Sequence, residues 1–146
     1  ESVRADSKAD SVHLAMFPEV DPRWADTKLA ERWEQLLEVR TAVQAALEVQ
    51  RREKVIGAPL EAKVLIDAHS AQYNLLKTYG QDLPAFFIVS DVVLQSAPDL
   101  PEKPGFVITV EKATGVKCER CWNYRGSVGT SSDHPTLCDR CVEAVR

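Results

Sequence analysis

Residues 118–141 read CERCWNYRGSVGTSSDHPTLCDRC, and they contain all four cysteines of the 146-residue chain. The cysteines form two Cys-x-x-Cys pairs with sixteen residues between them, a spacing typical of a zinc ribbon or a related four-cysteine knuckle. Four thiolates favour zinc, which forms closed tetrahedral sites without a vacant position. We therefore expect one structural zinc ion, held by Cys118, Cys121, Cys138 and Cys141.

Other interpretations of these cysteines stay open at the level of sequence. A rubredoxin-like iron centre uses the same ligands, two disulfides would suit a secreted chain, and redox thiols would suit a thioredoxin-like fold. His134, four residues before Cys138, could also replace one ligand. No secretory segment is visible and no βαβ pattern surrounds either pair, which favours zinc over the alternatives.

Composition and charge are those of an ordinary globular chain. Apolar residues make up 45% and charged residues 27%, and no apolar run is long enough to cross a bilayer, so we expect a cytoplasmic protein. The net charge of -4 argues against a generally basic nucleic-acid binder. Residues 103–146 nevertheless carry seven Lys or Arg against five Asp or Glu, whereas residues 1–102 carry eleven against seventeen. Part of this positive charge would offset the thiolates.

A long helix is predicted in the first half of the chain, where no Gly or Pro occurs between Asp26 and Lys54. Its apolar positions mostly share one helical face: Leu29, Trp33, Leu36, Val43 and Leu47. We predict a helix over about residues 26–54, with Asp26 as its cap and Gly57 as the left-handed residue beyond its end. Trp24 and Trp33 are expected to be core residues.

A small sheet is predicted between the helix and the cysteines. The pattern indicates strands over residues 62–67, 85–89 and 106–111 and a short helix over 70–79. Residues 91–94 either continue the strand at 85–89 or start another, and residues 97–104 form a proline-rich loop. This order predicts the α+β class, with a long helix, a small βαββ sheet unit and a C-terminal four-cysteine zinc knuckle. Only residues 113–115 join the sheet to the knuckle, so we expect the two to be held together.

No catalytic constellation is visible. His13, His69 and His134 lie on separate segments, and neither a recognisable nucleophile nor a glycine-rich phosphate loop occurs.

The residues around the first cysteine pair are instead suited to contact with RNA. Arg120 and Trp122 flank Cys121, and Lys117, Tyr124 and Arg125 lie within a few residues. Guanidinium beside an aromatic ring is suited to unpaired RNA bases. The alternative is that Trp122 covers the metal and packs on the sheet.

Several motifs together resemble a known family. Residues 117–124 read KCERCWNY, Val128-Gly129 and a polar loop follow, and residues 137–141 read LCDRC. This pattern resembles the C-terminal zinc-binding tail of bacterial-type isoleucyl-tRNA synthetases. The segments KVIGAPLEA, FPEV and WEQLLEVR resemble the region before that tail and lie at residues 54–62, 17–20 and 33–40.

The resemblance implies the C-terminal part of a class I enzyme that attaches isoleucine to its tRNA with ATP. ATP would bind in a catalytic domain, whose His-x-Gly-His and Lys-Met-Ser-Lys-Ser signatures this sequence lacks. The chain alone is therefore expected to be non-catalytic. The implied parts are the end of an anticodon-binding helical region over residues 1–57, a small α+β junction domain over residues 58–112 and a zinc-binding module over residues 113–146.

The implied partners are isoleucine tRNA and the upstream domains of the same enzyme. We expect a monomer with no membrane or DNA partner. Arg120 and Trp122 match the Arg-Cys-Trp motif of the family and are the expected RNA contacts, with Lys117, Tyr124 and Arg125 beside them. The rival hypothesis is a structural, zinc-stapled protein-interaction module that does not touch RNA.

Overall fold

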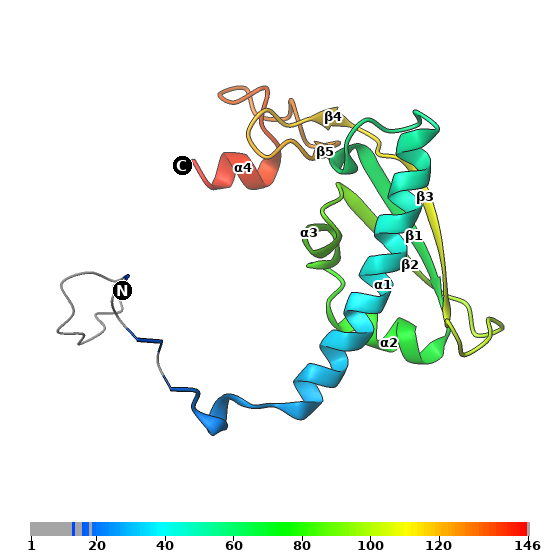
Figure 1. Cartoon of the computed structure of the whole chain (residues 1–146). Coiled ribbons are helices and arrows are strands. Elements are labelled where there is room, and N and C mark those ends of the chain that lie inside the picture. The colour runs from blue at the N-terminus through cyan, green and yellow to red at the C-terminus, as the bar shows by residue number, and fades with distance from the viewer. Residues whose placement is uncertain (1–12, 14–15, 18, 146) are drawn as a thin grey trace.

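The computed structural model describes His13, Met16, Phe17 and residues 19–145. Residues 12, 14 and 15 lie outside the described residues, so the short apolar segment at residues 12–17 is only half described. Figure 1 shows a long helix beside a small sheet, with the cysteine-bearing segment at one end of that sheet. Among the described residues, no helix has the length and apolar content that a membrane span requires.

The long helix is α1 (Thr27–Arg52), close to the predicted range. Asp26 caps its start, because the carboxylate accepts the backbone N–H of Leu29 at 2.9 Å. The helix presents one buried stripe to the core: Leu36, Val39, Val43 and Leu47. A short 3-10 turn (Pro22–Trp24) precedes α1, and another (Pro59–Glu61) follows it.

The expected role of Gly57 at the end of α1 was wrong. Lys54, with φ of 61°, is the left-handed residue, because the chain turns directly after the last helical residues and before it reaches Gly57. The backbone N–H of Gly57 instead donates to the Glu61 carboxylate at 2.9 Å.

The expected burial of Trp24 and Trp33 was also wrong. Trp24 is 72% exposed and Trp33 is 41% exposed, although the Trp33 ring packs edge-on against Phe86 with 5.6 Å between ring centroids. The buried stripe begins only at Leu36, because the first turns of α1 extend past the sheet (Figure 1).

The sheet has three strands in the order β2-β1-β3. β1 (Ala62–Ala68) lies between the parallel strand β2 (Asp91–Ser96) and the antiparallel strand β3 (Phe106–Lys112). Burial alternates along β1: Ala62, Val64, Ile66 and Ala68 are fully buried, and the residues between them are only partly buried. The helices therefore cover one face of the sheet and leave the other open.

Residues 85–89 do not form the predicted strand. After α2 (Ser70–Thr78), they lie mostly in the short helix α3 (Leu83–Phe87), and Ile88 ends this helix in the left-handed region. A five-residue apolar run cannot be assigned to strand or helix by periodicity alone. The available signal was Pro84, a residue type that favours the first turn of a helix. The βαββ order still holds, with α3 inserted before β2.

The cysteine-bearing segment contains a small hairpin and a last short helix. β4 (Val116–Lys117) pairs antiparallel with β5 (Tyr124–Arg125), and α4 (Asp139–Glu143) follows the second cysteine pair. Gly115 has φ of 95°, and a Cβ there would lie 2.5 Å from the carbonyl carbon of Arg125. Only glycine permits this close approach of the two strands.

One buried hydroxyl joins the hairpin to the sheet. Ser90 is fully buried, and its Oγ donates to the backbone oxygen of Leu60 at 2.5 Å and accepts the backbone N–H of Tyr124 at 2.7 Å. The backbone N–H of Ala113 also donates to Glu61 O at 2.7 Å. These contacts hold the knuckle against the sheet, as expected. Ser90 has no recognisable signal in the sequence, because nothing in its local context marks it as buried or as a hydrogen-bond partner.

We expect Ser90→Ala to destabilise the chain by about 1–3 kcal/mol, because it removes a buried hydroxyl and leaves the part-buried N–H of Tyr124 without its acceptor. Urea denaturation of the zinc-loaded chain would measure this loss, and hydrogen exchange should show earlier opening at Tyr124. Ser132→Ala is the matched control, since Ser132 is exposed and its change should stay within about 0.5 kcal/mol. Equal stability of the two variants would contradict the proposed link.

Candidate metal centre

The four cysteine sulfurs converge on one point. Among the described residues, the group of possible metal ligands consists of Cys118, Cys121, Cys138 and Cys141, and their sulfurs all lie within 4.8 Å of one another. The Sγ atoms of Cys121 and Cys138 are 3.7 Å apart. A regular tetrahedron with zinc–sulfur bonds of about 2.3 Å has edges of about 3.8 Å, so the donor set fits zinc.

The same geometry decides two of the alternatives left open by the sequence, the pair of disulfides and the histidine ligand. All four cysteines are free thiols, so they do not form two disulfides. His134 is not part of the ligand group; its backbone oxygen instead accepts the N–H of Leu137 at 3.1 Å. Four sulfur donors and no other ligand describe a closed, structural site.

Tight turns aim the sulfurs inward. In the first pair, the backbone N–H of Cys118 donates to Asn123 O at 2.9 Å and the N–H of Trp122 donates to Cys118 O at 2.8 Å. In the second pair, Cys138 precedes α4, and the N–H of Cys141 donates to Cys138 O at 2.9 Å. The N–H of Cys138 also donates to Cys118 Sγ at 3.3 Å, which joins the two turns.

Two of the thiols have opposite shifts in pKa. Burial disfavours ionisation of Cys118, but backbone N–H groups of Cys121, Cys138 and Arg120 outweigh it and lower its pKa to about 6. At Cys138 burial dominates and raises the pKa to about 12. A bound divalent cation would supply the charge that keeps such a buried thiolate deprotonated.

Two arginines lie against the sulfurs. Arg120 Nη1 donates to Cys141 Sγ at 3.8 Å. The pKa of Arg140 is raised, mainly because its side chain is hydrogen-bonded to Cys121. Each arginine therefore belongs to one cysteine pair and interacts with the other. Four thiolates around one divalent ion leave two negative charges, and these guanidinium groups offset them.

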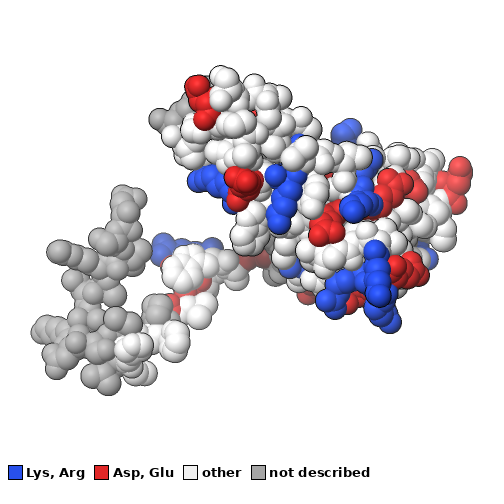
Figure 2. All heavy atoms as spheres, turned by 90° about the horizontal axis from the view of Figure 1, so that it is seen from above, with Lys and Arg blue, Asp and Glu red and all other residues white. Residues whose placement is uncertain are grey.

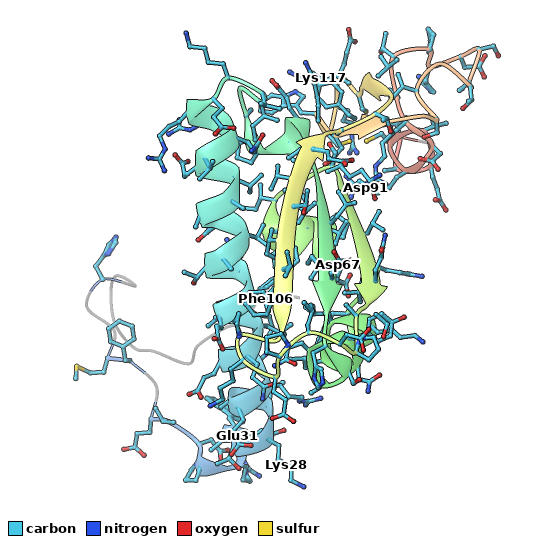
Figure 3. The ribbon with its side chains drawn as sticks, turned by 90° about the vertical axis from the view of Figure 1, so that its right-hand side faces the viewer. Lys28, Glu31, Asp67, Asp91, Phe106 and Lys117 are labelled. Carbon is cyan, nitrogen blue, oxygen red and sulfur yellow. The ribbon has the colours of Figure 1, made fainter. Side chains whose placement is uncertain are left out.

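The expected RNA-contact residues lie in the hairpin of the first cysteine pair, on β4, on β5 or between them. Trp122 is 59% exposed, so it does not seal the metal site, and the Lys117 ammonium lies 5.7 Å from its ring centroid. Trp122 also has φ of 64°, an uncommon conformation for a residue other than glycine. Tyr124 and Arg125 lie on β5 and are partly buried. Figure 3 shows Lys117 beyond one end of the sheet.

The surrounding surface is mixed in charge. Figure 2 shows Lys and Arg at several separate places on the face seen from above, with Asp and Glu between them. The pKa of the Asp139 carboxyl is lowered mainly by hydrogen bonds from the backbone N–H of Arg140 and from Ser127. The nearby positive charge of Arg125 lowers it further. No continuous basic surface is visible on this face.

Residues 115–144 match the family model described as the zinc finger found in FPG and IleRS. The match covers the cysteine-bearing segment, and its four clustered cysteines are suited to hold one zinc ion.

The whole chain has more particular relatives. It is 45% identical over 93% of its length to the isoleucine–tRNA ligase of Geobacter sulfurreducens, and 46% identical over 94% to that of Syntrophotalea carbinolica. The ligase of Moorella thermoacetica is 40% identical over 97% of the chain. The chain spans 15–16% of the length of these relatives. It is thus similar, along nearly its whole length, to a small part of isoleucine–tRNA ligases, and the resemblance found in the sequence is confirmed.

Proposed function

We propose that this chain is the C-terminal tRNA-binding part of an isoleucine–tRNA ligase and is not catalytic by itself. In this proposal residues 1–57 end an anticodon-binding helical region, residues 58–112 form a junction domain and residues 113–146 form the zinc module. In this proposal isoleucine and ATP bind to domains outside this chain, and the upstream domains of the same ligase are its structural partners.

The observation that carries the proposal is the exposed indole of Trp122 beside the zinc knuckle. The knuckle holds the backbone of Trp122 through its N–H bond to Cys118 O, and the ring faces solvent beside Lys117. An exposed aromatic ring with a neighbouring cation is suited to stack on an unpaired base while the cation meets a phosphate. Backbone strain at an exposed side chain is frequent at binding sites.

Trp122→Ala gives the cleanest test. Arg120 is less suitable, because its guanidinium also contacts Cys141 and its removal would disturb the metal centre. We expect Trp122→Ala to weaken binding of isoleucine tRNA by about 5- to 150-fold, the range that corresponds to loss of one stacked base, while zinc content stays unchanged. Fluorescence anisotropy with labelled tRNA would measure the affinity, which should also fall with added salt.

The control is Val107→Ala, because Val107 is also an exposed apolar residue but lies on β3, outside both the zinc module and the helical region. This variant should bind tRNA as the parent chain does. Equal affinity of the Trp122→Ala variant and the parent would instead favour the rival hypothesis, in which zinc only staples the chain end for stability or protein contact. In that case, removal of the module from the whole ligase would lower its melting temperature without changing its tRNA affinity.

A further inference from the structure

One of the four cysteines differs from the others in its contact with solvent. Cys118, Cys138 and Cys141 are at most 1% exposed, whereas Cys121 is only partly buried. Cys121 is the last residue of the first Cys-x-x-Cys pair, and the exposed Trp122 follows it directly. A small reagent in solution therefore meets Cys121 before it meets the other three cysteines.

The surroundings of Cys121 are those of a reactive cysteine. Zinc is bound by the deprotonated form of cysteine, and the same form is the nucleophile that reacts with oxidants. Reactive cysteines lie in partly exposed, electropositive places, whereas buried structural cysteines are inert. Cys121 is partly exposed, and the cationic side chain of Arg140 is hydrogen-bonded to it. It therefore combines the two features that make a cysteine susceptible to oxidation.

A second sulfur lies within reach of Cys121, across the two pairs. Cys121 Sγ and Cys138 Sγ are 3.7 Å apart. Cys118 Sγ accepts the backbone N–H of Cys138 at 3.3 Å. Cys141 Sγ accepts Nη1 of Arg120 at 3.8 Å. Since the sulfurs of a disulfide are about 2.05 Å apart, an approach of about 1.7 Å would join Cys121 to Cys138.

We propose that Cys121 is an oxidation site for hydrogen peroxide and that Cys138 converts the product into a disulfide. The Cys121 thiolate attacks one oxygen of the peroxide, so that an S–O bond forms, the O–O bond breaks and hydroxide leaves. The sulfur has then lost two electrons and is a sulfenic acid. The Cys138 thiolate attacks this sulfur, the S–S bond forms, the S–O bond breaks and a second hydroxide leaves. Two thiolates and one peroxide thus give one disulfide and two hydroxide ions.

This disulfide removes two of the four metal donors. Cys118 and Cys141 alone do not make a closed four-sulfur site, so the chain no longer holds its metal. Residues 113–146 then lose the binding energy that keeps such a module folded. The inference does not rest on tRNA binding, because cysteine oxidation and metal loss are measured without RNA.

Sub-stoichiometric hydrogen peroxide, added to the zinc-loaded 146-residue chain, tests the order of these steps. With dimedone present to trap sulfenic acid, mass spectrometry should find the first adduct on Cys121. Without dimedone, peptide mapping should find a disulfide between Cys121 and Cys138, and a colorimetric chelator should detect released zinc. A dithiol with added zinc should reverse both changes. A first adduct on another cysteine, a disulfide within one Cys-x-x-Cys pair, or zinc retained after oxidation would overturn the proposal.

Two histidine replacements separate exposure from the loss of a sulfur ligand. Cys121→His removes the reactive sulfur but leaves three cysteines and one histidine, a common ligand set for structural zinc. Cys141→His makes the same change at the last, buried cysteine of the other pair and keeps Cys121. With both variants loaded with zinc, peroxide should release the metal at least about tenfold more slowly from Cys121→His than from Cys141→His. Equal rates would contradict the assignment of Cys121. If either variant fails to retain zinc, the order of adducts in the parent chain decides.

Discussion

Removal of the metal is expected to unfold residues 113–146 while the three-stranded sheet stays folded. Among the described residues of this module, the buried cluster consists of cysteines, with Val128 and Leu137 packed against it and Val142 as the one further buried apolar residue. So little apolar area cannot offset the chain entropy of a segment of this length. Structural zinc contributes about 10–16 kcal/mol of apparent binding energy, which is folding energy in such modules.

Hydrogen exchange with and without a chelator at neutral pH would measure this effect. Amides of β4, β5 and α4 should lose protection, whereas the amide of Ile66 in β1 should not. Elemental analysis before chelation should give one zinc per chain, and added zinc should restore protection. Cys138→Ser should cause the same loss without a chelator, since it removes one of the four ligands. Unchanged protection in the module after the metal has gone would contradict the assignment of a structural site.

The second large effect is expected for Ile66→Ala in the middle of β1. Ile66 is fully buried beneath the helices, and truncation would create a cavity that the packed core can only partly fill. The expected loss is about 2–5 kcal/mol in the free energy of unfolding, measured by urea denaturation at fixed zinc concentration. The neighbouring change Leu65→Ala removes the same number of carbon atoms from the open face, where the side chain is only partly buried. It should cost clearly less, and similar losses for both variants would argue against a sheet covered on one face.

These two experiments address separate sources of stability within one chain. The sheet unit has an apolar core of its own, formed by α1, β1 and the helices between β1 and β2. The zinc module has a core of sulfur atoms. Ser90 joins the two through a single buried hydroxyl, so Ser90→Ala tests whether opening of one part promotes opening of the other.

Arg120 illustrates why residue type alone does not assign a role. Its position beside Cys121 suits both RNA contact and neutralisation of the thiolates. In the fold its guanidinium lies 3.8 Å from Cys141 Sγ, which supports the second role without removing the first. Trp122 is different, because its side chain is exposed and its ring lies beside the Lys117 ammonium.

Local patterns in the sequence were sufficient for the elements with strong short-range signals. The two Cys-x-x-Cys pairs predicted the ligand group, because each pair forms a tight turn that needs no distant partner to bring its sulfurs together. Asp26 and the uninterrupted stretch after it predicted α1, and alternation predicted β3. Pattern and composition sufficed here because capping, periodicity and metal ligation act over a few neighbouring residues.

Other features depend on packing between segments far apart in the chain. The apolar run at residues 85–89 became a helix because Phe86 and Phe87 pack against α1 and the core, and Trp33 stayed exposed because the sheet ends short of it. The bond between Ser90 and Tyr124 and the open edge of β3 likewise have no signal in sequence. Burial and strand order depend on how the helices and the sheet pack together. A local sequence pattern is the same whatever packs against it, so it does not determine them.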